Sequence, residues 1–274
     1  MGIESLARPE ILAMKPYSSA RKEAPGEGIL LNANESPWTL IDEPGALNRY
    51  PDPQPAVLLS RLAGLYSVPE ENLLVTRGSD EGIDLLTRVF CRAGRDAILQ
   101  CPPTFGMYKI AAQTQGAEII SVDRIAGDGF RLDRQAVLDT LRDNRQAKLV
   151  FLTSPNNPTG DVIDPDFLRE LLQLTREQSI VVLDEAYAEF SDQPTAISLI
   201  DEFEHLVVLR TLSKAWASAG LRCGVVIAQP VLINLLRRVI APYPLPSPVV
   251  ELALRMLEKP VLKKQKKSLK RLQS

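Results

Sequence analysis

Short runs of β-branched and other apolar residues recur along this chain, and they constrain its fold more than any other feature. Seven such runs occur: Leu73 to Thr76, Ala97 to Cys101, Glu118 to Val122, Leu149 to Thr153, Ile180 to Asp184, Leu206 to Thr211 and Val225 to Ala228. Several lack polar alternation, which is typical of strands covered on both faces. Helical patterns, such as Asp80 to Cys91 and Asp166 to Gln178, separate some of them. The sequence therefore predicts an α/β domain with a mostly parallel sheet.

Composition and charge exclude several classes of function. The chain has 274 residues, is 24% charged and has a formal net charge of -2, which argues against general attraction to nucleic acid or to a membrane surface. No apolar run reaches the roughly 18 residues that span a bilayer, and the first ten residues lack a secretory signal pattern. We therefore expect a cytoplasmic protein. The single histidine, His205, excludes a histidine-cluster metal site, and no metal is predicted. The cysteines Cys91, Cys101 and Cys223 have no metal or redox spacing.

The chain divides into three predicted parts. Residues 1–45 form a proline-marked arm, residues 46–257 form the main α/β domain, and residues 258–274 form a basic tail. This tail carries seven Lys or Arg residues after Glu258 and no acid. Without these seven, the chain would have 25 basic and 34 acidic residues, so an acidic body is joined to a basic tail.

Four polar stretches lie at the ends of predicted strands. The first could bind an anion, and the second could hold a side-chain amide against a ligand. In "VTRGSDEG" (75–82) a strand ends at Gly78, and a helix is expected to begin near Ser79 or Asp80. Unpaired N–H groups at such a helix start can bind phosphate, although a simple N-cap is the alternative. In "SPNNPTG" (154–160) a rigid turn could hold the Asn157 amide against a ligand, or be only a turn.

The other two stretches deliver acids, a phenol and an amine. "IVVLDEAYAEF" (180–190) ends a strand at Asp184, with Tyr187 just beyond. A nucleotide hydrolase would need a partner loop G-x-x-x-x-G-K-[ST], which the chain lacks, while an N-capping Asp is a structural alternative. "TLSKAWASAGLRCG" (211–224) sets Lys214 among hydroxyl groups and follows it with Arg222. A surface lysine is the alternative there.

Taken together, the four stretches match the needs of pyridoxal phosphate. Its aldehyde requires an amine for a Schiff base, its ring nitrogen requires an acid, its phenolate oxygen requires donors, and its phosphate requires a cup. One cofactor thus accounts for all four stretches.

The chain also resembles the aspartate-aminotransferase superfamily, and within it the histidinol-phosphate aminotransferases. The resemblance covers most of residues 15 to 255. It is carried by these blocks: "KPYSSAR" (15–21), "LNANESP" (31–37), "NRYPDPQP" (48–55), "RGSDEGIDLL" (77–86), "CPPTFGMY" (101–108), "SPNNPTG", "DEAYAEF", "RTLSKAWASAGLRCG" and "VIAPYPLPSPV" (239–249). It implies a three-layer αβα large domain with a seven-stranded sheet, and transamination between L-histidinol phosphate and 2-oxoglutarate in histidine biosynthesis.

The resemblance implies a role for each site residue. Lys214 would form the Schiff base and then move the substrate's proton, Asp184 would pair with the ring nitrogen, and Tyr187 would work beside Asn157 at the phenolate oxygen. The cofactor phosphate would be bound by Gly78, Ser79, Asp80, Thr211, Ser213 and Arg222. Phe105 would stack on the ring, where relatives often have Tyr. Tyr50 would reach the phosphate of a neighbouring subunit, which implies a homodimer, and Tyr17 would lie near the substrate's phosphate.

The sequence departs from this family at its end. Family members continue into a smaller domain that supplies arginines for the substrate's anionic groups, and that domain is expected to be largely missing here. The resemblance fades near Leu257, and "KPVLKKQKKSLKRLQS" is either a disrupted end or a basic helix for an acidic partner. Two alternative functions remain: a related enzyme, namely an aromatic transaminase or phosphothreonine decarboxylase, or a cofactor-binding remnant without catalysis.

Overall fold

A seven-stranded sheet forms the middle layer of the protein. The computed structural model describes residues 2–17, 32–41 and 47–273, so parts of the predicted arm and of the blocks at 15–21 and 31–37 lie outside the described residues. The strands are β1 (Leu73–Thr76), β2 (Ala97–Gln100), β3 (Glu118–Ser121), β4 (Ala147–Thr153), β5 (Ile180–Asp184), β6 (Leu206–Thr211) and β7 (Gly224–Ile227). All seven predicted strands are present, which confirms the predicted fold class.

The sheet is parallel except for one strand. Its order is β1-β7-β6-β5-β4-β2-β3, and β7 runs antiparallel to both of its neighbours. Thr153 pairs with Asp184, which in turn pairs with Leu209. The carboxyl ends of β4, β5 and β6 therefore lie side by side at one edge, where α/β sheets place their ligands.

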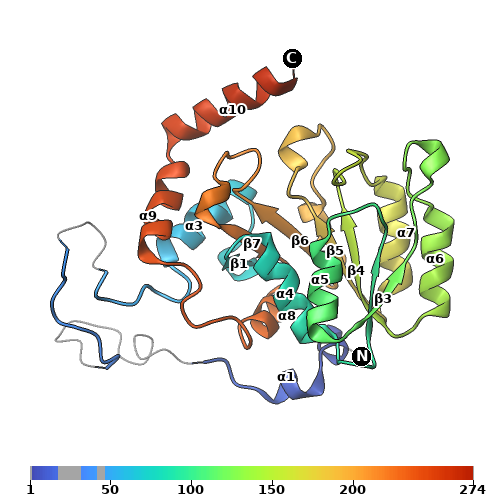
Figure 1. The fold of residues 1–274 in the computed structure, drawn as a ribbon, viewed down its shortest axis with the longest axis horizontal. Coiled ribbons are helices and arrows are strands. Elements are labelled where there is room, and N and C mark those ends of the chain that lie inside the picture. Colours follow the sequence, from blue (N-terminus) through green and yellow to red (C-terminus); the bar gives the residue numbers. More distant parts are fainter. Residues whose placement is uncertain (1, 18–31, 42–46, 274) are drawn as a thin grey trace.

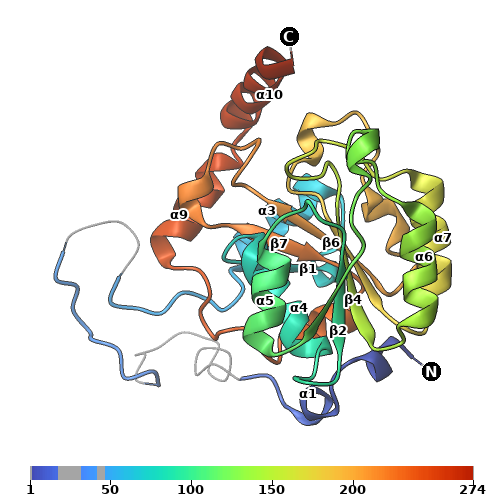
Figure 2. The same ribbon diagram turned by 45° about the vertical axis from the view of Figure 1, so that its right-hand side comes forward.

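Helices cover both faces of the sheet (Figure 1; Figure 2). One face packs against α1 (Pro9–Ala13), α4 (Ser79–Phe90), α5 (Met107–Gln115) and α8 (Pro230–Leu236), and the other against α3 (Ala56–Tyr66), α6 (Arg134–Asp143), α7 (Pro165–Thr175) and α9 (Ser247–Met256). The short 3₁₀ helices are η1 (Ile3–Leu6), η2 (Glu70–Asn72), η3 (Ala126–Asp128), η4 (Ala188–Phe190), η5 (Ala196–Leu199) and η6 (Ala219–Leu221). The result is a three-layer αβα architecture.

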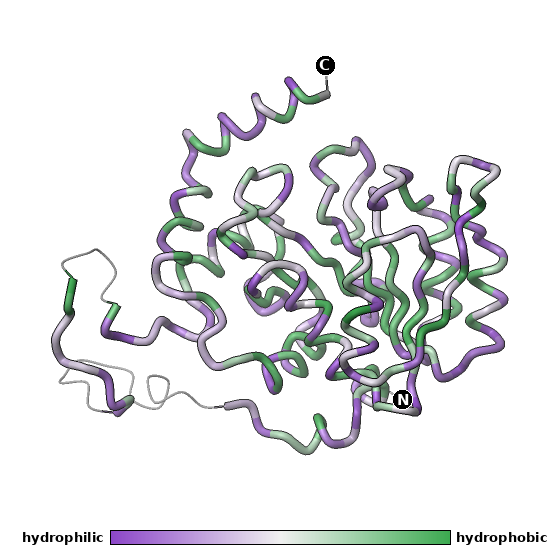
Figure 3. Tube along the Cα trace, viewed as in Figure 1, coloured by the Kyte–Doolittle hydropathy of each residue, from purple (hydrophilic) through white to green (hydrophobic). Residues whose placement is uncertain are grey.

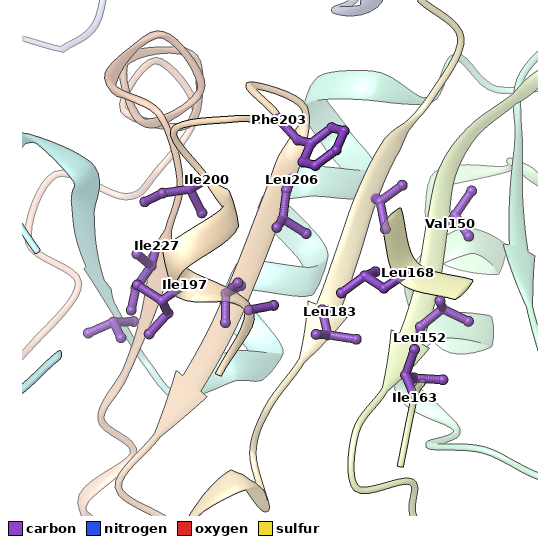
Figure 4. Close-up of a cluster of buried hydrophobic side chains, with 14 of the residues drawn as sticks. Val150, Leu152, Ile163, Leu168, Leu183, Ile197, Ile200, Phe203, Leu206 and Ile227 are labelled. Atoms are coloured by element: carbon purple, nitrogen blue, oxygen red, sulfur yellow. The ribbon is translucent and has the colours of Figure 1, made fainter. Parts of the chain in front are cut away.

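The protein has two hydrophobic cores, one on each face of the sheet, and the burial of its strands explains them. Every residue of β1, β2, β5, β6 and β7 is buried, because side chains of both strand faces meet a helix layer. Figure 4 shows one of these cores, where Leu183 and Leu206 from the sheet lie near Leu168 of α7 and Ile197 of η5. Apolar residues are accordingly concentrated on the strands in Figure 3.

Local caps fix where the helices begin. Asp133 accepts a hydrogen bond of 3.0 Å from the backbone N–H of Ala136, which caps α6. Asp164 accepts bonds of 3.0 Å from Asp166 and Phe167 at the start of α7, where proline occupies the first turn.

The basic end of the chain forms a helix. The segment α10 (Lys259–Gln273) follows α9 and projects beyond the sheet layers in both views (Figure 1; Figure 2). Within the described part of the chain, no helix has both the length and the apolar character needed to cross a membrane.

Candidate active site

A cavity of about 110 Å³ lies at the carboxyl ends of the central strands, beside the N-terminus of α4. Its lining residues are Ser79, Asp80, Phe105, Thr153, Asn157, Asp184, Ala186, Tyr187, Thr211, Ser213, Lys214, Ala219 and Arg222. Of the predicted site residues, only Gly78, Tyr50 and Tyr17 are not in this lining. The fold therefore brings together groups from five separated stretches of the sequence.

Asp184 is a buried carboxyl at the end of β5. Its side chain is held by the Tyr108 hydroxyl, which donates to Oδ2 at 2.8 Å, and by the backbone N–H of Ala186, which donates to Oδ1 at 3.0 Å. Burial raises the pKa of Asp184 to about 6, because desolvation outweighs these two hydrogen bonds. Among the described residues, no cationic side chain forms a salt bridge with it. The carboxyl is thus positioned to meet a positively charged group from a ligand.

Tyr108 is a site residue that the sequence reasoning missed. It is fully buried, its ring stacks on Phe151 with centroids 4.7 Å apart, and its hydroxyl lies 2.7 Å from Thr153 Oγ1. Burial, followed by the nearby Asp184 charge, raises the pKa of Tyr108 well above its usual value, so the phenol stays protonated and donates to Asp184. The only signal was its place in "CPPTFGMY", three residues after Phe105 and at the start of α5.

The amine, a phenol and an amide meet at another part of the cavity wall. Lys214 Nζ lies 5.4 Å from the centroid of the Tyr187 ring, and Asn157 Nδ2 donates to the Tyr187 hydroxyl at 3.2 Å. Asn157 lies beyond β4, Tyr187 beyond β5 and Lys214 beyond β6, so the parallel pairing of these strands sets the three side chains next to each other.

Hydroxyl, guanidinium and backbone donors gather around the start of α4. Arg222 donates from NH2 to Asp80 Oδ2 at 2.8 Å and from NH1 to Ser213 Oγ at 3.3 Å, and Thr211 Oγ1 donates to Ser213 Oγ at 3.0 Å. Together with the first N–H groups of α4, which begins at Ser79, these donors make an anion-binding cup.

Two glycines allow the close approach that this cup needs. Gly78 has φ +76°, and a Cβ there would lie 2.6 Å from Arg222 NH2. Gly224, which the sequence reasoning did not single out, begins β7, and a Cβ there would lie 2.6 Å from the backbone nitrogen of Ser79. A larger residue at Gly78 would have to move the Arg222 guanidinium, and one at Gly224 would meet the backbone of Gly78 and Ser79.

Three predicted aromatic residues have different positions. Phe105 lines the cavity and meets the Tyr108 ring edge-on, with centroids 5.7 Å apart. Tyr50 instead stacks on Tyr243 at 4.5 Å and is 49% exposed, while Tyr17 is 62% exposed and lines a separate surface cavity. Within this one chain, neither Tyr50 nor Tyr17 lines the candidate site.

The groups around the cavity fit pyridoxal phosphate. Lys214 offers an amine to an aldehyde, and the cup beside Gly78 offers donors to a phosphate. Among the residues that the structure describes, the buried Asp184 carboxyl has no cationic partner, and a protonated ring nitrogen would provide one.

Comparisons with known proteins point to the same family. A model of "Aminotransferase class I and II" matches residues 17–274, which includes α10. The histidinol-phosphate aminotransferase of Cronobacter sakazakii is 49% identical over 259 residues, covering 94% of this chain and 71% of that protein. The enzyme of the same name from Salmonella paratyphi B is 48% identical over the same shares of the two chains.

Solved structures share the fold. The histidinol-phosphate aminotransferase from Sinorhizobium meliloti, in complex with pyridoxal-5'-phosphate, matches with a TM-score of 0.74 at 23% identity, covering 81% of this chain and 59% of that one. The enzyme of the same name from Clostridium acetobutylicum matches with a TM-score of 0.71 at 22% identity, covering 81% and 64%. These structures show the fold alone. The family model and the curated relatives establish that this chain belongs to the class I and II aminotransferases and, among them, to the histidinol-phosphate aminotransferases.

Proposed function

We propose that this protein transfers an amino group between L-histidinol phosphate and 2-oxoglutarate. In the biosynthetic direction, glutamate donates the amino group and imidazole-acetol phosphate accepts it, as a step of histidine synthesis. The observation that carries the proposal is that Lys214, the buried carboxyl of Asp184 and the cup around Arg222 line one cavity in a member of this family.

Pyridoxal 5'-phosphate is the proposed cofactor, and its ring supplies an electron sink for the charge left when the substrate's α-carbon loses a proton. Asp184 would hold a proton at the ring nitrogen. Phe105 would pack on the ring face. The phosphate would be held by Gly78, Ser79, Asp80, Thr211, Ser213 and Arg222.

Lys214 is the proposed base. Its amine would first anchor the cofactor and, once displaced by the substrate's amino group, would move the proton at the substrate α-carbon. Tyr187 and Asn157 would donate hydrogen bonds to the phenolate oxygen, and their mutual contact of 3.2 Å supports a shared target. Each role assigns a group to an atom that its chemistry suits.

Further proposals concern assembly and location. We propose a homodimer in which the exposed ring of Tyr50, held by its stack on Tyr243, reaches the cofactor phosphate of a second copy, and in which Tyr17 lies near the substrate's phosphate. A cytoplasmic location is also proposed, and the free, buried thiols of Cys91, Cys101 and Cys223 support it.

Reduction with sodium borohydride tests the cofactor assignment. Protein incubated with pyridoxal 5'-phosphate, reduced and digested should carry a pyridoxyl group on the peptide that contains Lys214, and Lys214→Arg should carry none. A label confined to another lysine would refute the assignment.

Absorbance changes test the reaction itself. Glutamate added to the holoenzyme should shift the cofactor band, imidazole-acetol phosphate should reverse the shift, and the steady state should follow ping-pong kinetics. Release of carbon dioxide from O-phosphothreonine would instead indicate a decarboxylase. A bound cofactor with no response to any amino donor would indicate a remnant without catalysis.

A further inference from the structure

A buried ionic cluster connects the segment that carries Lys214 with the segment that carries Tyr187. At its centre is Arg210 on β6, which is 8% exposed. Its NH1 donates to Glu185 Oε2 at 2.9 Å, and its NH2 donates to Glu189 Oε1 at 2.7 Å. Both acids belong to the segment that follows β5, so this single guanidinium joins the end of β6 to the chain beyond β5.

The indole of Trp216 closes the cluster. Trp216 is 6% exposed, and its Nε1–H donates to the same Glu189 Oε1 at 3.1 Å. Glu189 lies two residues after Tyr187, and Trp216 lies two residues after Lys214. The carboxylate of Glu189 therefore links the two segments at a point close to both functional side chains.

The cluster is fixed to the body of the protein. Glu185, which is 3% exposed, also accepts hydrogen bonds from Thr195 Oγ1 at 2.5 Å and from the backbone N–H of Ala196 at 2.7 Å. On its other side, Arg210 lies over the ring of Tyr66, at the end of α3, with Cζ 5.0 Å from the centroid. The link is thus tied to η5 and to α3, and not only to the two loops.

We propose that Arg210, Glu189 and Trp216 form a positioning clamp that sets the separation between Lys214 and Tyr187. The β5–β6 ladder ends at Asp184 and Leu209, where the backbone N–H of Glu185 still donates to the Leu209 carbonyl at 3.0 Å. Tyr187 and Lys214 lie beyond this ladder. The clamp links the two segments there with charge-assisted bonds that are shielded from water. This inference rests on the proposed function, because the two clamped side chains matter only if both address the cofactor.

A loosened clamp has a specific chemical consequence. The Tyr187 hydroxyl can donate a hydrogen bond to the cofactor's phenolate oxygen only while it is held in place. That bond would weaken the hold of the negative oxygen on the proton beside the Lys214 nitrogen, so the proton would be lost at a lower pH. When the Tyr187 segment moves, the proton is retained to higher pH. The clamp therefore sets a titration midpoint as well as the stability of the fold.

The test uses two clamp variants and a matched control in the holoenzyme. Glu189→Gln removes the charge that Arg210 and Trp216 share. Trp216→Phe removes the N–H donor and keeps a buried aromatic ring, although a smaller one. The control is Glu202→Gln, which breaks the exposed pair between Arg169 and Glu202, two residues that do not line the candidate site. For each protein, the cofactor's absorbance is titrated with pH, cofactor affinity is measured, and the melting temperature of the cofactor-free form is recorded.

We expect the titration midpoint to move up by about half a pH unit or more in both clamp variants, together with a several-fold loss of cofactor affinity, and not to move in the control. Lower melting temperatures with unchanged midpoints in both clamp variants would overturn the proposal and leave a purely structural cluster. If Glu189→Gln does not fold, Trp216→Phe alone decides between these outcomes. Failure of the wild-type protein to bind the cofactor would instead refute the proposed function.

Discussion

Replacing Asp184 by asparagine should stabilise the cofactor-free protein at neutral pH, although it removes the carboxylate from the site. The hydrogen bonds can survive: the amide oxygen still accepts from Ala186, and the amide nitrogen can donate to the Tyr108 oxygen while that hydroxyl turns to Thr153. The main change is therefore the loss of a buried negative charge.

The magnitude follows from the pKa of this carboxyl. Burial raises the pKa of Asp184 from 3.8 to about 6. A difference of about 2 units corresponds to about 3 kcal/mol of unfavourable free energy when the carboxyl is ionised in the folded state. Because the folded pKa is the higher one, this cost is absent below about pH 4, grows between about pH 4 and 6, and is constant above that range. We expect a stability gain for Asp184→Asn of about 1 to 2 kcal/mol at pH 5 and about 3 kcal/mol at pH 7.5.

Urea denaturation of cofactor-free protein, followed by circular dichroism at pH 5 and pH 7.5, measures the gain. The control is Asp192→Asn, a substitution of an exposed acid, which should change stability by no more than about 0.5 kcal/mol at either pH. If Asp184→Asn is less stable than the wild type at pH 7.5, or if its gain is the same at both pH values, the argument from the buried charge is wrong. The same variant should bind pyridoxal 5'-phosphate more weakly, which would show that the site carries this cost for its function.

Three further outcomes are expected. Tyr108→Phe removes a hydrogen bond that lowers the pKa of the Asp184 carboxyl. In urea titrations, the pH above which stability becomes constant should therefore be higher for this variant than for the wild type, and the variant should be less stable by about 1 to 2 kcal/mol. Gly78→Ala would place a Cβ 2.6 Å from Arg222 NH2, so cofactor affinity measured by fluorescence should fall at least about tenfold. The control is Gly94→Ala, which is also at positive φ but has nothing within 4 Å of the added Cβ. It should lower stability without changing cofactor affinity. The pKa of His205 is lowered to about 4, mainly because the imidazole is buried. In NMR spectra its ring proton resonances should therefore not shift between about pH 5.5 and 8.

Much of the sheet could be predicted because short runs of consecutive apolar residues distinguish its buried strands from the rest of this sequence. β1, β5 and β6 begin and end at the predicted residues. β4 begins two residues before its predicted start, at Ala147, where Lys148 interrupts the apolar pattern that the prediction used. β7 begins one residue early, at Gly224, a residue type that strands usually avoid.

Other features of the site had no signal of their own. Tyr108 follows the pattern of a buried aromatic residue on a helix, and only its approach to Asp184 from a different strand gives it a part in the site. Arg210 lies inside an apolar strand, where its charge is explained only by two acids that the fold brings from the β5 segment. A polar group inside a core depends on partners that are distant in sequence, so local patterns cannot find it.

The sequence by itself determined the α/β class, the strands and the set of groups at their carboxyl ends, because periodicity and turn chemistry are local properties of the chain. Tertiary structure alone decided which of these groups share a cavity, that burial raises the pKa of Asp184 to about 6, and that Tyr50 and Tyr17 lie away from the site within one chain. Desolvation and hydrogen bonding depend on the distances between side chains from separate strands, and those distances exist only once the sheet has formed.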